Sequence, residues 1–231
     1  MLPTDLLRAS AAELDLALDE PTLGSLARYV ELLANAPLNV TGTRDHVELW
    51  RSHVRDALTL LPLLPPGASR LVDVGSGGGL PGVPLAIARP DLEVVLLEAT
   101  ARKAAFLEAV AERLELRRVR VVAARAEEAG HDPALRGRFD VATCRAVGPL
   151  REIAEYALPL LAVGGVLLAP KGGRGPDEVD EAEQALATLG GGSPEVRPTG
   201  HGDRSVVIVP LQRPTPEAWP RRPGRPRKAP L

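Results

Sequence analysis

The stretch Asp73-Val74-Gly75-Ser76-Gly77-Gly78-Gly79-Leu80-Pro81-Gly82 decides the fold. It directly follows an apolar run at 71–74 and precedes a segment that we predict to be a short helix at 84–89. Glycines allow the backbone to turn sharply and to approach a ligand closely. A glycine-rich turn between a strand and a helix therefore indicates a ligand-binding loop.

The spacing within this loop separates the possible ligands. A dinucleotide fingerprint that starts at Gly75 needs its third glycine at position 80, where Leu80 stands. A phosphate-binding loop needs Lys followed by Ser or Thr, and no Lys follows these glycines. The pattern is instead Gly75, Gly77 and Gly79 behind Asp73, which resembles motif I of the S-adenosylmethionine-dependent methyltransferases. A nicotinamide enzyme and a purely structural glycine turn are the alternatives.

An acidic residue closes the next predicted strand. Glu98 follows the apolar run at 94–97, where a carboxylate can accept hydrogen bonds from both hydroxyls of a ribose. An NAD site also needs an acid there, so Glu98 alone does not separate the two cofactors. S-adenosylmethionine carries a sulfonium cation and no phosphate, and the acids of this region suit it. We therefore predict S-adenosylmethionine as the cofactor.

Strands and helices alternate on both sides of the loop. The strands are predicted at 71–74, 94–97, 119–123, 139–144, 165–169 and 205–209. The helices between them are predicted at 84–89, 101–114, 150–161 and 177–189. Such alternation is typical of an α/β fold with a doubly wound, mostly parallel sheet and helices on both faces, in the Rossmann-like manner.

The segment before this pattern reads as helical. Leu14, Ala17 and Leu18 have helical spacing, a second helix is expected to start near Pro21, and Asp45 is a candidate cap for a third helix that runs to about residue 61. We expect three parts: a helical extension at 1–66, a methyltransferase domain at 67–212 and a Pro-rich tail at 213–231.

The tail is basic although the whole chain has a net charge of -2. Between residues 213 and 231 there are six basic residues and one acidic residue. Such a segment can attract phosphate while the domain stays near neutral, but it can also be a solvated, disordered terminus. Its prolines predict no regular structure and an extended path along the domain or beyond it.

Composition limits where the protein works. Cys144 is the single cysteine, so no internal disulfide can form, and the amino terminus lacks a charged-then-apolar leader. No apolar run approaches the ~20 residues that a membrane span needs. We expect a soluble, cytoplasmic protein without a membrane partner, and nothing requires more than a monomer. Cys144 lacks the partner motif of cytosine-5 methyltransferases, so we do not assign it as a nucleophile.

Beyond the class, the chain resembles the ribosomal small-subunit RNA methyltransferase family G (RsmG, also called GidB). The resemblance covers the chain from about residue 35 to its end. Its pieces are Asn39-Val40-Thr41, His53 with Asp56, Asp73 to Pro84, Arg89-Pro90, Arg102-Lys103 with Phe106-Leu107, Ala126-Glu127-Glu128, Cys144-Arg145-Ala146-Val147, Lys171-Gly172, Arg204 and the tail from Trp219.

This resemblance implies methyl transfer from S-adenosylmethionine to N7 of one guanine in 16S rRNA, as free rRNA or in the small ribosomal subunit. It also implies cofactor contacts at Gly75, Leu80, the Ala126-Glu127 pair and Arg145. We add Gly77 from the loop pattern and Glu98 from the fold. An acidic turn facing solvent is the alternative for Ala126-Glu127-Glu128.

The expected chemistry needs positioning rather than a general base. Guanine N7 is an unprotonated lone pair at neutral pH, so catalysis can rest on orientation. Arg145 and Lys171 are the candidate positioning residues because they follow two neighbouring strands, and neither a catalytic base nor a metal ligand is assigned. The candidates for contact with RNA are His53, Lys171, Arg204, Arg221 and Arg222.

Each candidate also has a structural alternative. Arg145 could pair with an acid from a loop, Lys171 could be a surface lysine and Arg204 could close a hairpin, while His53 and Asp56 could pair structurally on one helix face. Two other functions stay open: a methyltransferase for another RNA, a small molecule or a protein, and a non-catalytic RNA-binding assembly factor.

Overall fold

The computed structural model describes residues 4–200 and 202–231. Within them, seven strands form one sheet in the order β3-β2-β1-β4-β5-β7-β6. The strands are β1 (Arg70–Val74), β2 (Glu93–Leu97), β3 (Val119–Val122), β4 (Phe139–Thr143), β5 (Leu161–Lys171), β6 (Glu195–Pro198) and β7 (Ser205–Pro210).

Strands β1 to β5 pair in parallel, and β7 pairs antiparallel with both β5 and β6. The prediction of a mostly parallel, Rossmann-like sheet is confirmed. The strand order reverses between β1 and β4, which is where open α/β sheets bind their ligands. The carboxyl ends of β1, β2, β4 and β5 therefore share one edge beside this reversal.

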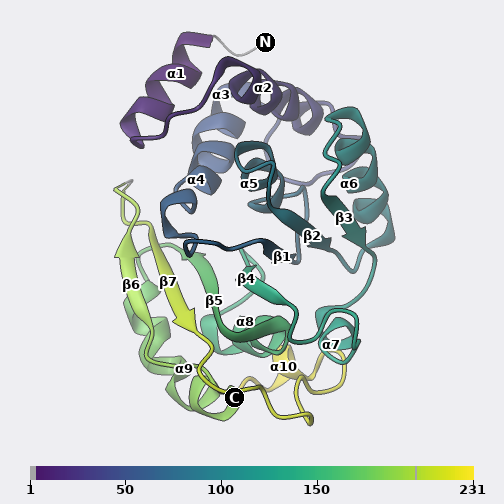
Figure 1. The fold of residues 1–231 in the computed structure, drawn as a ribbon, viewed down its shortest axis with the longest axis vertical. Helices are drawn as coiled ribbons and strands as arrows, with labels where there is room; N and C mark the ends of the chain where they lie inside the picture. The colour runs from purple at the N-terminus through teal and green to yellow at the C-terminus, as the bar shows by residue number, and fades with distance from the viewer. Residues whose placement is uncertain (1–3, 201) are drawn as a thin grey trace.

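Helices cover both faces of the sheet (Figure 1). The α-helices are α1 (Thr4–Glu13), α2 (Glu20–Ala34), α3 (His46–Leu49), α4 (Arg55–Leu58), α5 (Gly82–Ala88), α6 (Ala101–Arg113), α7 (Ala126–Ala129), α8 (Leu150–Ala157), α9 (Gly175–Leu189) and α10 (Arg225–Lys228). Two short 3₁₀ turns lie at Leu61–Leu63 and Leu158–Leu160.

Alternate residues of the strands enter two separate hydrophobic cores. Leu71 and Leu96 belong to the first core, which contains α2, α4, α5 and α6, whereas Val72 and Val95 belong to the second, with α8 and α9. Because successive side chains of a strand point to opposite faces, this division follows from the apolar strand runs.

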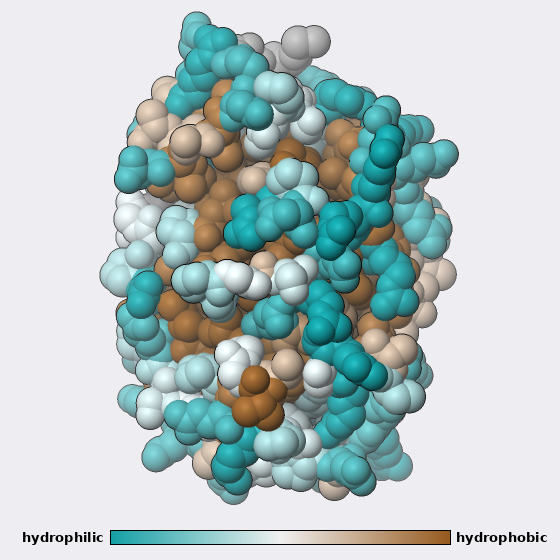
Figure 2. Space-filling view, viewed as in Figure 1, coloured by the Kyte–Doolittle hydropathy of each residue, from teal (hydrophilic) through white to brown (hydrophobic). Residues whose placement is uncertain are grey.

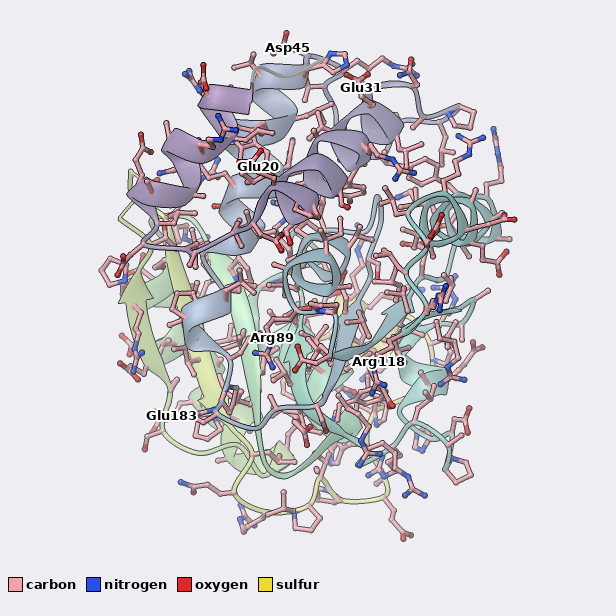
Figure 3. The ribbon with its side chains drawn as sticks, turned by 45° about the horizontal axis from the view of Figure 1, so that its top comes forward. Glu20, Glu31, Asp45, Arg89, Arg118 and Glu183 are labelled. Atoms are coloured by element: carbon pink, nitrogen blue, oxygen red, sulfur yellow. The ribbon has the colours of Figure 1, made fainter. Side chains whose placement is uncertain are left out.

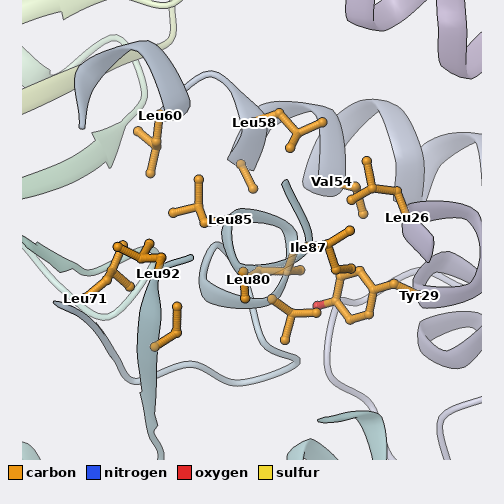
Figure 4. Close-up of a cluster of buried hydrophobic side chains, with 14 of the residues drawn as sticks. Leu26, Tyr29, Val54, Leu58, Leu60, Leu71, Leu80, Leu85, Ile87 and Leu92 are labelled. Atoms are coloured by element: carbon orange, nitrogen blue, oxygen red, sulfur yellow. The ribbon is translucent and has the colours of Figure 1, made fainter. Parts of the chain in front are cut away.

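The amino-terminal helices share the first core with the sheet. Figure 4 shows Leu26 and Tyr29 of α2 in one cluster with Leu80 and Ile87. The buried Tyr29 hydroxyl donates a hydrogen bond to the Gly78 carbonyl at 2.8 Å, so α2 supports the glycine loop.

The division of the chain into three parts, at residues 1–66, 67–212 and 213–231, stays a prediction.

The amino-terminal helices agree with the sequence patterns in two of three cases. Asp19 caps α2 by accepting from the Thr22 amide, and Asp45 caps α3 by accepting from the Glu48 amide. The prediction of a helix around Leu14 and Leu18 is wrong. These residues lie in the connection between α1 and α2, where Asp15 has a φ of 54°.

A π-helical turn, Trp50–Val54, joins α3 to α4 into one helical segment. Such turns insert one extra residue into a helix and often occur at functional sites. His53 lies in this turn and Asp56 in α4, and both line the same cavity.

The end of the chain differs from the prediction. The tail packs on the domain, passes α7 and α8 and forms the short helix α10, so the expectation of no regular structure is wrong (Figure 1). The sequence patterns also missed α7 and the strand β6.

No helix within residues 4–200 and 202–231 has the length and apolarity that a membrane span requires. Figure 2 shows hydrophilic residues spread across one face of the molecule, with hydrophobic residues visible between them.

Candidate functional site

Two cavities lie at the carboxyl-terminal edge of the parallel strands. The first, of about 190 Å³, is lined by residues that include Gly75, Ala126 and Glu127. The second, of about 430 Å³, is lined by residues that include His53, Arg145, Lys171 and Arg204. The loop after β4 contributes Val147 to the first cavity and its neighbours Ala146 and Gly148 to the second. This loop is therefore the common wall.

The glycine loop has the backbone shape that its sequence requires. Gly75, Gly77 and Gly79 all have positive φ, at 70°, 58° and 99°. A Cβ on Gly75 would lie 2.7 Å from Val147 Cγ2, and one on Gly79 would lie 2.6 Å from Val83 Cγ2. Side chains at Gly75 and Gly79 would thus meet both strained dihedrals and a steric clash.

Asp73 is fully buried and holds the loop rather than facing a cavity. One carboxylate oxygen accepts from the Gly82 amide at 3.0 Å, and the other accepts from the Thr143 hydroxyl at 3.1 Å. Burial raises the pKa of Asp73 from 3.8 to about 6, although these hydrogen bonds act in the opposite direction. Asp73 connects the start of α5 to β4.

We expect Asp73→Asn to change how stability depends on pH. Since the folded-state pKa lies above the unfolded one, the folded protein binds more protons between pH 4 and pH 6. Ionising Asp73 then removes about 3 kcal/mol of stability as the pH rises through this window. The asparagine side chain of the variant would stay neutral, and its amide can hydrogen-bond to both present partners.

Urea unfolding of both proteins at several pH values tests this expectation. The free energy of unfolding of the variant should rise relative to the wild type as the pH increases from 4 to 6. Comparing the two proteins cancels the carboxylates that titrate alike in both. A difference that does not depend on pH would show that Asp73 is not the group with the raised pKa.

Glu98 is also bound to the loop. Its two carboxylate oxygens accept from the Gly77 amide at 2.9 Å and from the Thr100 amide at 2.8 Å, and its exposure is 6%. Each oxygen keeps a second lone pair that could accept from a ribose hydroxyl, and this ribose contact stays a prediction.

Gly77 and Leu80 are not among the residues that line either cavity, and Leu80 packs in the first core.

Ala126 and Glu127 begin α7 and line the first cavity. Glu127 is buried, and one of its oxygens accepts from the Gly224 amide of the tail at 2.7 Å. The alternative of an acidic turn in solvent therefore does not describe Glu127. A further buried acid, Glu152, lines the same cavity and accepts from the Tyr156 hydroxyl at 2.9 Å.

The second cavity contains a cluster of cations around one acid. Asp56 forms ion pairs with Arg204 at 2.9 Å and with Arg145 at 3.3 Å. Arg145 also donates to His53 Nδ1 at 3.1 Å. Burial, followed by the Arg145 charge, lowers the pKa of His53, which favours the neutral ring that can accept this bond. The structure thus brings together His53, Arg145 and Arg204, which the sequence offered as separate candidates.

Lys171 lines this cavity but is mostly buried, with 9% of its side chain exposed. It forms an ion pair with Glu178 at 2.7 Å and donates to the Gly148 carbonyl at 2.9 Å. Glu178 in turn accepts from the Leu150 amide at 2.7 Å. Lys171 therefore orients the loop after β4, and its contact with RNA stays a prediction.

Arg221 and Arg222 lie outside both sets of lining residues. Arg221 forms an ion pair with the fully buried Glu155 at 2.6 Å and lies over the Trp219 ring at 5.0 Å from its centre. Its guanidinium is thus engaged inside the protein. Arg222 is exposed, and its contact with RNA stays a prediction.

Cys144 follows β4 with 1% exposure, and burial raises the pKa of its thiol far above the ordinary value. A thiol nucleophile requires the thiolate, which this environment disfavours.

Sequence reasoning missed the partner acids Glu155 and Glu178. Glu155 lies 66 positions from Arg221, and Glu178 lies 28 positions from Leu150, and no local pattern signals such pairs.

The glycine loop at the strand reversal, beside the cavity that Glu127 lines, defines a class I S-adenosylmethionine-dependent methyltransferase. Solved structures share the fold. One is a 16S rRNA methyltransferase of T. thermophilus in complex with AdoMet and guanosine, at a TM-score of 0.54 and 19% identity over 81% of this chain and 47% of that one. Another is the cofactor-bound Rv0187 from MTB, at a TM-score of 0.55 and 21% identity over 92% of this chain and 99% of that one.

The family model "rRNA small subunit methyltransferase G" matches residues 22–207, so the chain belongs to this family. The ribosomal RNA small subunit methyltransferase G of Roseiflexus castenholzii is 44% identical over 94% of each chain. The protein of the same name from Sorangium cellulosum is 48% identical over 76% of this chain and 74% of its own. The resemblance drawn from the sequence motifs is confirmed.

Proposed function

We propose that this protein transfers a methyl group from S-adenosylmethionine to N7 of a guanine in 16S ribosomal RNA. The observation that carries the proposal is the pair of cavities that share the loop after β4. One has carboxylates and apolar walls, and the other has three cationic or imidazole side chains around Asp56. A cofactor and a base in these two cavities would meet at the shared loop.

The first cavity fits the cofactor chemically. Glu127 and Glu152 supply carboxylates beside the apolar side chains of Val74 and Leu97. Arg125 and Arg227 also line the cavity. The two carboxylates can face the sulfonium and the ammonium of the cofactor, both of which are cations. When bound, S-adenosylmethionine supplies the methyl group of its sulfonium and leaves as a thioether. Gly75, Ala126 and Glu127 would hold it.

The second cavity would hold the target base. The Arg145 guanidinium is planar and carries several donors, and Arg is the usual partner of the O6 edge of guanine. Arg204 adds a second cation for O6 or a phosphate. Asp56 fixes the positions of both guanidinium groups. No residue has to remove a proton, because N7 is already an unprotonated lone pair, and catalysis would rest on alignment.

Nucleoside mass spectrometry tests the proposal. The protein would be incubated with methyl-labelled S-adenosylmethionine and unmodified 16S rRNA, both free and within small subunits. Labelled 7-methylguanosine at a single site is the expected product. Label on a different base or atom would replace the assigned reaction, and no label despite cofactor binding would favour the non-catalytic assembly factor.

A further inference from the structure

The tail is attached to the domain at several independent points before it reaches the first cavity. Arg136 donates to the carbonyls of Thr215 and Trp219, both at 2.7 Å. His131 contacts the Pro220 carbonyl at 2.7 Å, and a Cβ on Gly130 would lie 2.6 Å from Pro220. The loop after α7 is thus shaped to receive this part of the tail.

The next residue along the tail is attached by charge. Glu155 is fully buried in α8, and it accepts hydrogen bonds from both the backbone amide and the guanidinium of Arg221. A buried carboxylate without such partners would carry a large desolvation cost. The pair therefore fixes the position of the tail three residues before Gly224.

The tail then borders the first cavity directly. Gly224 and Arg227 line it together with Gly75, Ala126 and Glu127. The Gly224 amide donates to Glu127, one of the residues assigned to the cofactor. The Arg227 side chain is exposed, and among the residues that the structure describes its guanidinium has no ion pair or hydrogen bond. A cation without a partner thus lies in the lining of a cavity that also contains Glu127 and Glu152.

We propose that residues 219–228 form a wall of the cofactor cavity and that Arg227 is an additional cofactor-binding residue. A planar guanidinium can stack on an aromatic ring such as adenine. The Gly224 amide fixes one oxygen of Glu127 and leaves the other for the ligand. The inference rests on the proposed cofactor, and it assigns part of the basic tail to the cofactor rather than to RNA.

Calorimetric titration with S-adenosylmethionine tests whether residues 219–228 contribute to cofactor binding. The proteins are the full chain, Arg227→Gln, a deletion of 224–231 and the matched control Arg225→Gln, whose exposed side chain lies on α10 but not in the cavity. We expect the deletion to raise Kd about tenfold and Arg227→Gln to raise it about threefold, as for loss of contacts with a charged group. Arg225→Gln should leave Kd unchanged.

A second readout is hydrogen exchange of residues 219–228, which should slow when S-adenosylmethionine is added to the full chain. Unchanged Kd for Arg227→Gln together with unchanged exchange would overturn the inference, even if the deletion variant fails to fold. If the full chain itself binds no S-adenosylmethionine, the proposed cofactor is wrong, and the inference about residues 219–228 is then wrong as well. If the full chain binds S-adenosylmethionine and neither tail variant changes Kd, the proposed cofactor stands and only the inference about residues 219–228 is refuted.

Discussion

Replacing Arg221 by Ala is expected to destabilise the protein by about 3–5 kcal/mol, because it leaves a buried carboxylate without its charge partner. Glu155 is fully inaccessible, and three of its four hydrogen bonds come from the Arg221 guanidinium. Only the Arg221 backbone amide would remain as a donor. The free energy of unfolding in urea measures this loss.

A double-mutant cycle separates the ion pair from general packing. Glu155→Gln alone removes the buried charge, and in the Arg221→Ala background it should restore part of the lost stability, since a neutral amide is less costly to bury. Arg222→Ala is the matched control because its side chain is the neighbouring tail arginine and is exposed. If Arg221→Ala loses no more stability than Arg222→Ala, the tail is not held by this pair.

The sequence was sufficient for the features that depend on neighbouring residues. The glycine loop, the apolar runs of β1 and β2 and the caps at Asp19 and Asp45 are all encoded within a few positions. The position of Glu98 at the end of β2 follows from the same short pattern. In each of these features, residues a few positions apart in the sequence determine the backbone geometry or the burial.

The features that sequence reasoning missed depend on distant partners. β6 has only Val196 as an apolar residue among Glu195, Arg197 and Pro198, and it exists because it pairs with β7 at the edge of the sheet. The tail is ordered by acids that lie 66 and 97 positions away. A basic, Pro-rich composition gives no sign of such partners, so it predicted an extended tail without regular structure.

The catalytic candidate with the largest expected effect is Arg145. We expect Arg145→Ala to lower kcat/KM for 16S rRNA by about 100-fold, as for loss of a residue that orients the reacting atoms. Its guanidinium lies in the second cavity, bound to Asp56 and His53, with 16% of the side chain exposed. Asp56 would keep its ion pair with Arg204, so the fold should survive the substitution.

The same variant decides which ligand Arg145 serves. The family resemblance assigns it to the cofactor, whereas it lines the second cavity, which we propose holds the base. A contact to the base predicts a large loss of kcat/KM with S-adenosylmethionine affinity changed less than about threefold, since lost contacts affect only the ligand that makes them. Arg145→Lys should recover only part of the loss, because an ammonium keeps the charge without the planar fork. Arg118→Ala is the control: Arg118 (labelled in Figure 3) is exposed and lines neither cavity. A loss that appears mainly in cofactor affinity would assign Arg145 to the first cavity and leave Arg204 as the cation that holds the base.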